Sequence, residues 1–343
     1  MVSVRRIVPT LYLLVSALAL TAGTGCPVVS NRPAPGEILR QRDPELNREY
    51  LLYVPTSYHD ERQWPLVVAC HGTKPFDNAS LQLDEWKGLA EERGFLVVAP
   101  ELLGTSAPPP SPEVQIARQL EDEKAILSIV RTVRAARSVD ETRIFLTGWS
   151  AGGYAVLFTG LRHPDVFRAL AARQGNFDER FLEPTIPFLD RNQPIFVMYG
   201  NLDPLKDDAV RAVEWLERHD LRPRQLERTG AHRREPEPVY SFFVDVVRNH
   251  PWIRIGVEDD PTDPMRVRFT VRTSFPASRY LWDFGDGERS TSASPVHTYS
   301  DPSLYTVKVA VYTAGGTPFV RQVQLQIPRV RLGATPLPTP SGQ

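Results

Sequence analysis

The pattern of hydrophobic and polar positions divides the chain into two parts. Between residues 50 and 249, short apolar or β-favouring runs alternate with helical patterns, whereas residues 254–328 show period-two alternation and no helical pattern. Alternating strands and helices indicate an α/β layer fold, with helices on both faces of a doubly wound, mostly parallel sheet. The second part is predicted to be a smaller, separate all-β sandwich.

The predicted elements follow from these patterns. Buried strands are expected at residues 51–54, 66–69, 95–99, 144–147, 170–172 and 195–199. Helices are expected at residues 81–93, 114–137, 154–163, 209–219 and 240–249, and Ser111-Pro112 supplies a cap and first turn for the second of them. The predicted boundaries are a linker at 26–49, the α/β domain at 50–250, the sandwich at 254–328 and a proline-rich tail at 329–343. The acidic stretch 258–261 is expected to join the two domains.

The amino terminus has the pattern of an export signal. Arg5 and Arg6 precede an apolar stretch at 7–22, which small residues and Cys26 follow. A cysteine after small residues resembles a bacterial lipobox, although Gly23 stands where leucine is usual. We predict that residues 1–25 are a signal peptide and that the protein is exported to the bacterial cell envelope. There it is either secreted or anchored in the membrane through lipid on Cys26.

Composition narrows the classes of partner. Hydrophobic residues make up 41% of the 343 positions, which is enough for one full-sized core and a smaller second one. The net charge of −1 gives no reason to expect a nucleic-acid partner. The chain has two cysteines, and Cys70 lies in an apolar strand-like run, so no internal disulfide is expected.

The most informative motif is Gly148-Trp149-Ser150-Ala151-Gly152, which follows an apolar run and precedes a helical pattern. It has the Gly-x-Ser-x-Gly form of a nucleophile elbow, where a strained turn from strand to helix exposes the serine hydroxyl. A side chain at position 148 or 152 would collide with neighbouring backbone, so both positions require glycine. The context favours Ser150 as a nucleophile over a chance glycine- and serine-rich loop.

A serine nucleophile needs a general base, and the base needs an acid that fixes its tautomer. In α/β-hydrolases the acid and then the histidine follow the serine along the chain. Asp203 follows the strand at 195–199, and His232 precedes the last predicted helix, so these two are the candidates. Asp207 and Asp208 are interpreted as first-turn charges of a helix. The other histidines fit less well by position: His59, His163, His219, His250 and His297.

The same chemistry needs donors for the oxyanion. The backbone N–H groups of Ala151 and Thr73 are predicted to supply them, because Ala151 follows the nucleophile and Thr73 follows an early strand. Gly72 permits close approach of that loop, and His71 is interpreted as a brace for it. The predicted site uses no cofactor and no metal.

The second domain carries a recognisable sequence at 280–287, Tyr-Leu-Trp-Asp-Phe-Gly-Asp-Gly, with further matches at 296–299 and 305–307. This segment resembles the polycystic-kidney-disease-type (PKD) domain, an immunoglobulin-like sandwich. Trp282 and Phe284 are expected to face the core. Asp283 and Asp286 could hold calcium, but two carboxylates in a turn more often cap backbone amides, so no metal site is predicted.

The first domain has several short characteristic segments, at 52–55, 65–68 with 71–72, 94–100, 143–148 and the elbow. Through these segments it resembles secreted serine esterases of the feruloyl esterase and polyhydroxybutyrate depolymerase group. The resemblance implies hydrolysis of carboxylic esters through an acyl-enzyme, with small, polysaccharide-linked and polyester substrates all open. The chain departs from the group at 233–236, Arg-Arg-Glu-Pro. Both arginines are expected to face water; if they line the site instead, they favour substrates that carry a carboxylate.

Two other functions compete with the esterase. A serine peptidase could use the same triad, and no residue separates ester from amide substrates. A non-catalytic surface lipoprotein could use both domains for adhesion or as a scaffold, because one fold hosts many functions. The completeness of the predicted constellation favours an enzyme.

Overall fold

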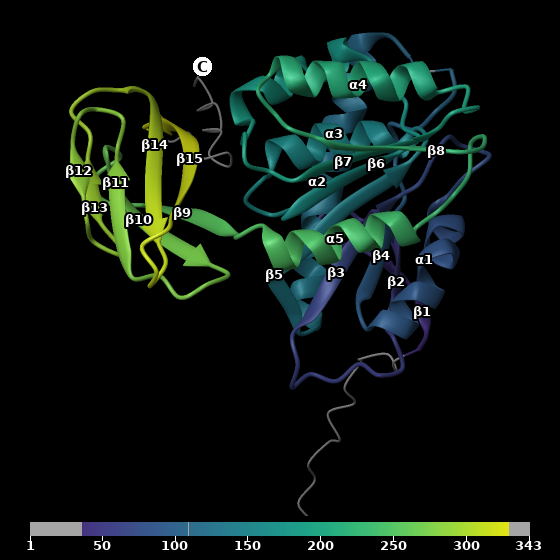
Figure 1. The fold of residues 1–343 in the computed structure, drawn as a ribbon, viewed down its shortest axis with the longest axis horizontal. Helices are drawn as coiled ribbons and strands as arrows, with labels where there is room; N and C mark the ends of the chain where they lie inside the picture. The colour runs from purple at the N-terminus through teal and green to yellow at the C-terminus, as the bar shows by residue number, and fades with distance from the viewer. Residues whose placement is uncertain (1–35, 109, 329–343) are drawn as a thin grey trace, which may run out of the picture. The chain divides into compact units, whose positions relative to one another are not determined.

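The structure is a computed structural model that describes residues 36–108 and 110–328 (Figure 1). The predicted signal peptide, Cys26 and the proline-rich tail lie outside these residues. Within the described ranges, none of the helices combines the length and the hydropathy needed to span a membrane.

An eight-stranded sheet forms the first domain, in the order β1-β2-β4-β3-β5-β6-β7-β8. The strands from β3 to β8 run parallel to one another, whereas β2 is antiparallel to both β1 and β4. The prediction of a mostly parallel sheet is confirmed. The strands are β1 (Ile38–Arg42), β2 (Glu49–Tyr53), β3 (Trp64–Cys70), β4 (Leu96–Pro100), β5 (Val139–Trp149), β6 (Ala169–Arg173), β7 (Ile195–Gly200) and β8 (Arg224–Arg228).

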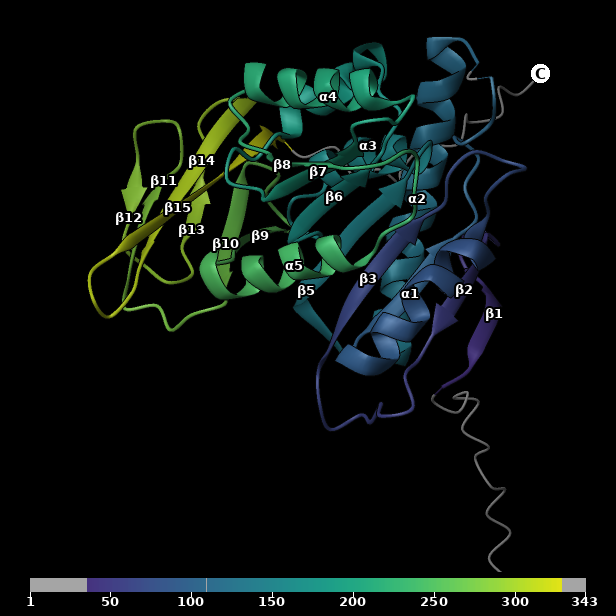
Figure 2. The same cartoon turned by 45° about the vertical axis from the view of Figure 1, so that its right-hand side comes forward.

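Helices cover both faces of this sheet (Figures 1 and 2). Side chains of α1 and α5 share one buried cluster with the sheet, and those of α2, α3 and α4 share the other. All five helices were predicted; in the structure each begins two or three residues earlier than predicted, and the second, third and fourth end one residue earlier. They are α1 (Ala79–Arg93), α2 (Pro112–Ala136), α3 (Gly152–Arg162), α4 (Lys206–Arg218) and α5 (Glu237–Asn249).

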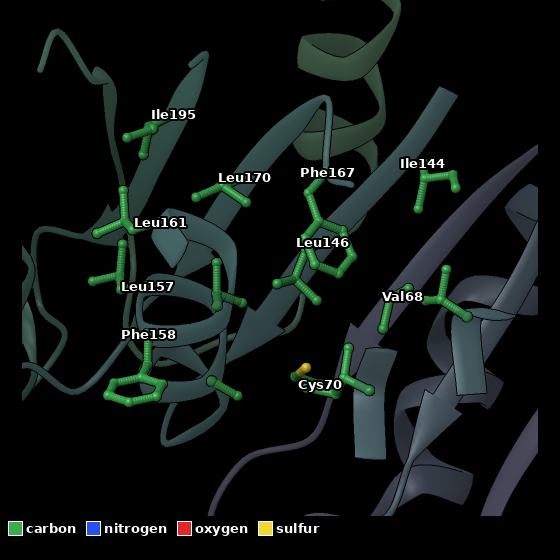
Figure 3. Close-up of a cluster of buried hydrophobic side chains, with 14 of the residues drawn as sticks. Val68, Cys70, Ile144, Leu146, Leu157, Phe158, Leu161, Phe167, Leu170 and Ile195 are labelled. Atoms are coloured by element: carbon green, nitrogen blue, oxygen red, sulfur yellow. The ribbon is translucent and has the colours of Figure 1, made fainter. Parts of the chain in front are cut away.

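The central strands are apolar on both faces, which explains their continuous hydrophobic runs. Along β3, Leu66, Val68 and Cys70 face the helices α2, α3 and α4, whereas Val67 and Ala69 face α1 and α5. Figure 3 shows Val68 and Cys70 beside residues of β5 and α3 in the first of these clusters. Each fully buried aliphatic side chain contributes about 1.5–3 kcal/mol to the free energy of folding, so this strand is firmly held in the sheet that carries the elbow.

Both edge strands were missed by the sequence analysis. β1 (Ile-Leu-Arg-Gln-Arg) lies inside the segment predicted as a linker at 26–49, so the sheet begins before residue 50. β8 (Arg-Gln-Leu-Glu-Arg) was not predicted at all. Side chains of edge strands are largely exposed to solvent, so these segments lack the hydrophobic pattern on which strand prediction depends.

The C-terminal part folds as two antiparallel sheets over one core, as predicted. One sheet has the order β13-β10-β9 and the other β12-β11-β14-β15. Trp282 and Phe284 are buried in this core, as expected. The acidic residues Glu258 and Asp259 belong to β9 and pair with β10, so they are not the predicted joint between domains. The strands are β9 (Ile253–Asp259), β10 (Arg266–Thr273), β11 (Arg279–Asp283), β12 (Arg289–Ser290), β13 (Val296–Thr298), β14 (Ser303–Tyr312) and β15 (Pro318–Ile327).

Candidate active site

Ser150 stands in the turn between β5 and α3 with a backbone φ of +54°. This left-handed conformation is unfavourable for serine and occurs mainly where the surrounding structure imposes it. A Cβ atom on Gly148 would lie 2.5 Å from the carbonyl oxygen of Gly152, and one on Gly152 would lie 2.6 Å from that of Cys70. The turn therefore has the tight geometry that the Gly-x-Ser-x-Gly pattern predicts.

Asp203 and His232 meet at the carboxyl ends of the strands. The Nδ1 atom of His232 lies 3.1 Å and 3.0 Å from the two carboxylate oxygens of Asp203. An ionised carboxylate only accepts hydrogen bonds, so Nδ1 carries the proton and Nε2 keeps its lone pair. The Asp203 side chain is fully buried and also accepts a hydrogen bond from the Leu205 amide at 2.8 Å. The carboxylate is therefore fixed in the orientation that holds the imidazole.

The loops that carry these two residues are in direct contact. A Cβ atom on Gly200 would lie 2.3 Å from the carbonyl oxygen of Gly230, so only glycine allows this approach. The Gly230 carbonyl accepts a hydrogen bond from the Leu202 amide at 3.0 Å, and the Gly230 amide donates to the Asn201 side chain at 2.8 Å. The acid and the histidine are thus held by backbone contacts as well as by their own ion pair.

Trp149 connects the histidine to the elbow. The centroids of its indole ring and of the His232 ring are 4.5 Å apart, and Trp149 directly precedes Ser150. Among the described residues, no hydrogen bond joins the Ser150 hydroxyl to the His232 ring. Such catalytic contacts are often long in enzymes without substrate and shorten when substrate binds.

The loop after β3 passes against the elbow. A Cβ atom on Gly72 would lie 3.1 Å from the Ser150 Cβ atom and 2.9 Å from the indole ring of Trp149. The Gly72 amide donates to Asp77 Oδ2 at 2.6 Å and is therefore occupied. Within the described part of the chain, the amides of Thr73 and Ala151 donate to no protein acceptor. These two N–H groups, predicted as oxyanion donors, are available for a ligand.

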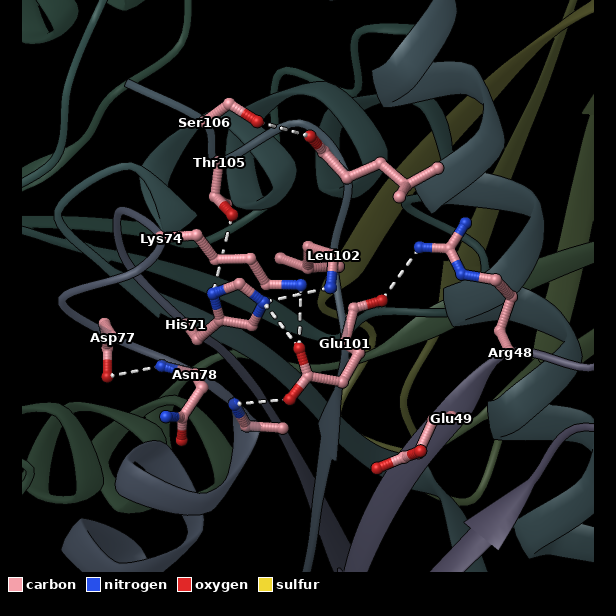
Figure 4. A network of polar contacts seen from close by, with 12 residues as sticks. Arg48, Glu49, His71, Lys74, Asp77, Asn78, Glu101, Leu102, Thr105 and Ser106 are labelled. Carbon is pink, nitrogen blue, oxygen red and sulfur yellow. Dashed lines mark hydrogen bonds and ion pairs between the residues drawn. The ribbon is translucent and has the colours of Figure 1, made fainter. Parts of the chain in front are cut away.

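His71 is a brace for this loop, as the sequence suggested. Its ring is fully buried, donates from Nδ1 to the Gly72 carbonyl at 2.8 Å and accepts at Nε2 from the Leu102 amide at 2.9 Å. Burial lowers the pKa of His71, so the ring stays neutral. Figure 4 shows the ring between Thr105, Leu102 and Glu101, the last of which also pairs with Lys74 at 2.8 Å. Both nitrogens are engaged, so His71 has no free lone pair for a serine.

The remaining candidates lie elsewhere. Asp207 and Asp208 occupy the first turn of α4, as predicted. His163 follows α3 and pairs with Glu123 at 3.1 Å. His219 and His250 stand at the C-terminal ends of α4 and α5, and His59 is exposed.

In the second domain, the two acidic residues of the Trp-Asp-Phe-Gly-Asp-Gly sequence cap backbone amides. Asp283 accepts from Gly285, and Asp286 accepts from Glu288, each at 3.0 Å. The second carboxylate oxygen of Asp286 lies 2.6 Å from His297 Nε2. Among the described residues, no three metal-ligating side chains are grouped so that they could hold an ion.

The structure also brings Arg234 and Asp77 to the site, and the sequence analysis assigned neither of them to it. Arg234 was expected to face water, but it is half-buried and its Nη2 atom lies 2.8 Å from Asp77 Oδ1. Its guanidinium group lies 4.5 Å from the Trp149 ring centroid. The prediction was wrong for Arg234 and right for Arg233, which is exposed. No local pattern could reveal a pair separated by 157 positions.

An open depression of about 900 Å³ lies between residues 177–180 and α4, and no residue of the candidate triad lines it. The segment that lines it follows Asn176, whose amide donates to the Ser150 carbonyl at 3.2 Å. Residues 177–180 and charged side chains of α4 line it. Its walls are therefore polar and open to solvent.

Two protein families match this chain. Residues 84–192 match the prolyl oligopeptidase family, and residues 248–327 match the PKD domain. The first match contains the elbow, and the second covers the sandwich. The chain consists of an α/β-hydrolase domain followed by a PKD domain. The predicted recognition and fold class are confirmed, and the hydrolase domain has the serine hydrolase fold that esterases and peptidases share.

Among curated proteins, the chain is 29% identical over 115 residues to poly(3-hydroxyalkanoate) depolymerase C of Paucimonas lemoignei, which is 32% of this chain and 28% of that protein. It is 40% identical over 48 residues to a collagenase of Bacillus cereus, which is 14% of this chain and 5% of the collagenase. The chain therefore matches less than a third of the length of either relative.

Two solved structures illustrate the structural likeness of the hydrolase domain. S-formylglutathione hydrolase of Staphylococcus aureus is 13% identical, with a TM-score of 0.49 over 63% of this chain and 98% of that one. A ferulic acid esterase of Anaeromyces mucronatus is 16% identical, with a TM-score of 0.46 over 60% of this chain and 88% of that one.

Proposed function

We propose that this protein is an exported serine esterase that hydrolyses carboxylic esters through an acyl-enzyme, with Ser150, His232 and Asp203 as its triad. The observation that carries the proposal is the strained serine of the elbow, beside a histidine whose Nδ1 is held by a buried carboxylate. Each group has the chemistry that its role requires.

In the proposed reaction, the Ser150 hydroxyl attacks the ester carbonyl carbon while Nε2 of His232 accepts its proton. The tetrahedral intermediate collapses, the C–O bond to the alcohol breaks, and the imidazolium donates its proton to the leaving alkoxide. Water then attacks the acyl-enzyme in the same way and releases the acid. Asp203 stays ionised throughout and stabilises the imidazolium.

The negative charge that develops on the carbonyl oxygen needs fixed donors. The unoccupied amides of Thr73 and Ala151 supply them in this proposal, because both belong to loops that meet at the elbow. Removal of one such donor typically costs about 10²–10³ in kcat.

The substrate is an ester of an extracellular polymer in this proposal, either a polyester or a polysaccharide-linked ester. Partial likeness to a poly(3-hydroxyalkanoate) depolymerase supports the polyester. The PKD domain would hold the enzyme near the polymer, and lipid on Cys26 would attach it to the membrane.

A peptidase is the second candidate, because residues 84–192 match the prolyl oligopeptidase family. A para-nitrophenyl ester and the anilide with the same acyl group separate the two activities. Hydrolysis of the ester with little turnover of the anilide supports the esterase, and the reverse result supports the peptidase.

The decisive experiment is labelling of the folded protein with a fluorophosphonate, followed by location of the adduct by mass spectrometry. We expect a single adduct on Ser150 and no labelling of Ser150→Ala. A folded protein that takes up no label would instead support the non-catalytic surface lipoprotein.

Fractionation of the wild type and Cys26→Ser tests the anchor, since only the wild type should sediment with membranes.

A further inference from the structure

Asp77 links three parts of the candidate site. Its side chain is 1% exposed and lies in the loop between β3 and α1. One oxygen accepts from the Gly72 amide at 2.6 Å and from Gln82 at 2.9 Å; the other accepts from the Asn78 amide at 3.0 Å and from Arg234 at 2.8 Å. The carboxylate therefore fixes the backbone that precedes Thr73, one of the proposed oxyanion donors.

Arg234 extends this link to the histidine loop, because it lies two residues after His232. Its guanidinium group covers the Trp149 ring at 4.5 Å, and the Trp149 ring is in turn 4.5 Å from the His232 ring. The indole N–H of Trp149 donates to Gln174 at 3.1 Å, and Gln174 donates to the Ala231 carbonyl at 3.3 Å. The histidine loop is thus tied to the elbow by one stack and one hydrogen-bonded bridge.

Further buried charges support the same network. Gln82, which donates to Asp77, accepts from Arg173 at 2.8 Å, and Arg173 also pairs with Glu85. The Arg173 side chain is fully buried, and the backbone carbonyl of Arg173 accepts from the Ser150 amide at 3.0 Å. The four groups that donate to Asp77 come from its own loop (Gly72 and Asn78), from α1 (Gln82) and from the histidine loop (Arg234).

We propose that the Arg234–Asp77 ion pair is a positioning device that sets the His232 base and the oxyanion donors at one fixed separation. This inference rests on the proposed function. Arg234 touches neither Ser150 nor a substrate in this role; it acts through Asp77 on the loop of Gly72 and through Trp149 on His232. Because its charge is already paired with a buried carboxylate, Arg234 is not a receptor for a substrate carboxylate.

The pair can have this effect because the two loops are otherwise far apart in the sequence and converge only at the site. A planar guanidinium group binds a carboxylate in a defined direction and stacks on an aromatic ring at the same time, which an ammonium group does less well. Errors of about 1 Å in the placement of reacting groups cost about 10² in rate. Loss of the pair is therefore expected to act on kcat rather than on substrate binding.

The test uses full-length Arg234→Gln, Arg234→Lys, Asp77→Asn and the double variant Asp77→Asn/Arg234→Gln, with Arg233→Ala as the matched control. The substrates are para-nitrophenyl butyrate, which is neutral, and mono-para-nitrophenyl succinate, which carries a carboxylate. Circular dichroism and thermal unfolding report whether each variant is folded.

We expect Arg234→Gln and Asp77→Asn each to lower kcat about 10²-fold on both esters, with a smaller change in KM. The double variant should be no worse than either single variant, because the two residues act as one unit. Arg234→Lys should keep the fold and lose less activity, and Arg233→Ala should resemble the wild type.

Two outcomes would overturn the proposal. If folded Arg234→Gln keeps wild-type kcat and only unfolds at a lower temperature, the pair has a structural role alone. If only the succinate ester loses turnover, Arg234 is a substrate receptor. A wild type that hydrolyses neither ester and takes up no fluorophosphonate would instead refute the proposed esterase itself, and this inference with it.

Discussion

Each domain contains one buried or half-buried Asp–His pair, and the two pairs differ in their surroundings. In the hydrolase domain, His232 binds Asp203 through Nδ1 at 3.0 Å and lies beside Trp149 of the elbow. In the PKD domain, His297 binds Asp286 through Nε2 at 2.6 Å. A histidine oriented by a carboxylate is therefore not by itself a sign of catalysis.

The neighbours of each ring account for the difference. The His297 ring stacks on Phe284, with centroids 4.1 Å apart, and meets Tyr299 edge to face at 4.5 Å. Those contacts place the ring in a packed aromatic cluster. The His232 ring instead lies with its centroid 4.5 Å from that of Trp149, the residue before the strained serine, and its Nε2 atom has no acceptor or donor among the described residues. Proximity to the strained turn at Ser150 is what distinguishes the first pair.

The largest effect is expected from Ser150→Ala. We expect a loss of esterase activity on the order of 10⁴ or more, because the attacking atom is removed. The fold should be intact, since the hydroxyl makes no hydrogen bond within the described residues. Steady-state hydrolysis of para-nitrophenyl butyrate measures the loss, and residual activity near the wild-type level would show that another residue is the nucleophile.

The two Asp–His pairs can then be compared directly. His232→Ala and Asp203→Asn should each lower kcat by about 10⁴, because the base is lost or held in the wrong tautomer. His297→Ala and Asp286→Asn should leave kcat unchanged and lower the thermal stability of the PKD domain. Equal losses of activity from both pairs would contradict the distinction drawn between them.

A smaller effect on kcat is expected when a glycine in crowded surroundings is replaced by alanine, and a glycine in open surroundings provides the control. Gly72→Ala adds a Cβ atom that meets Trp149, Asp77 and Ser150 within about 3 Å, so the loop must shift and kcat should fall about 10²-fold. Gly88→Ala, on α1, meets no atom within 4 Å and is the matched control. It should keep full activity and stabilise the helix by roughly 1 kcal/mol. Equal kinetics in the two variants would show that the loop at Gly72 is not close to the reacting groups.

The smallest effect is expected in the pH dependence of stability, which should differ between the two domains. Burial lowers the pKa of His71, so below about pH 6.5 the unfolded chain binds a proton that the folded chain does not. Stability from His71 is therefore present above that pH and is lost as pH falls. Comparison of wild type and His71→Gln by chemical unfolding between pH 7 and pH 5 measures it, and the variant should show the shallower dependence.

Asp286 titrates in a lower range. Burial raises its pKa, but hydrogen bonds from His297 and from the Glu288 amide outweigh burial and hold the pKa below the usual value. Its contribution is present above about pH 3.9 and is lost as pH falls further. Acid should thus weaken the hydrolase domain through His71 before it weakens the PKD domain through Asp286. If the acid unfolding of Asp286→Asn matches that of the wild type, Asp286 does not contribute to the acid sensitivity of the PKD domain.

The sequence was a good guide wherever the determining interactions are local. The elbow could be predicted because its Gly-x-Ser-x-Gly pattern spans five consecutive residues, from Gly148 to Gly152. The central strands and all five helices could be predicted because burial leaves a clear hydrophobic pattern. Asp203 and His232 could be placed together because chain order and strand ends restrict where the two loops meet.

The rest depends on contacts that no local pattern encodes. Arg233 and Arg234 are adjacent in sequence, yet only Arg234 turns inward, because Asp77 and Trp149 are there to receive it. β1 and β8 form because a sheet edge offers unpaired backbone groups, and their side chains remain in water.

Those two edge strands also bear on how the protein behaves at high concentration. The outermost strands of a sheet present free N–H and C=O groups to which another copy of the chain could add a strand. Here β1 carries Arg40 and Arg42, which pair with Glu49, and β8 carries Arg224 and Arg228, which pair with Asp245 and Glu235. An added strand would have to dehydrate these charges, so the polar edges oppose sheet-to-sheet aggregation. The exposed, charged side chains of β1 and β8 prevented the prediction of these strands from sequence, and the same side chains oppose the addition of a ninth strand.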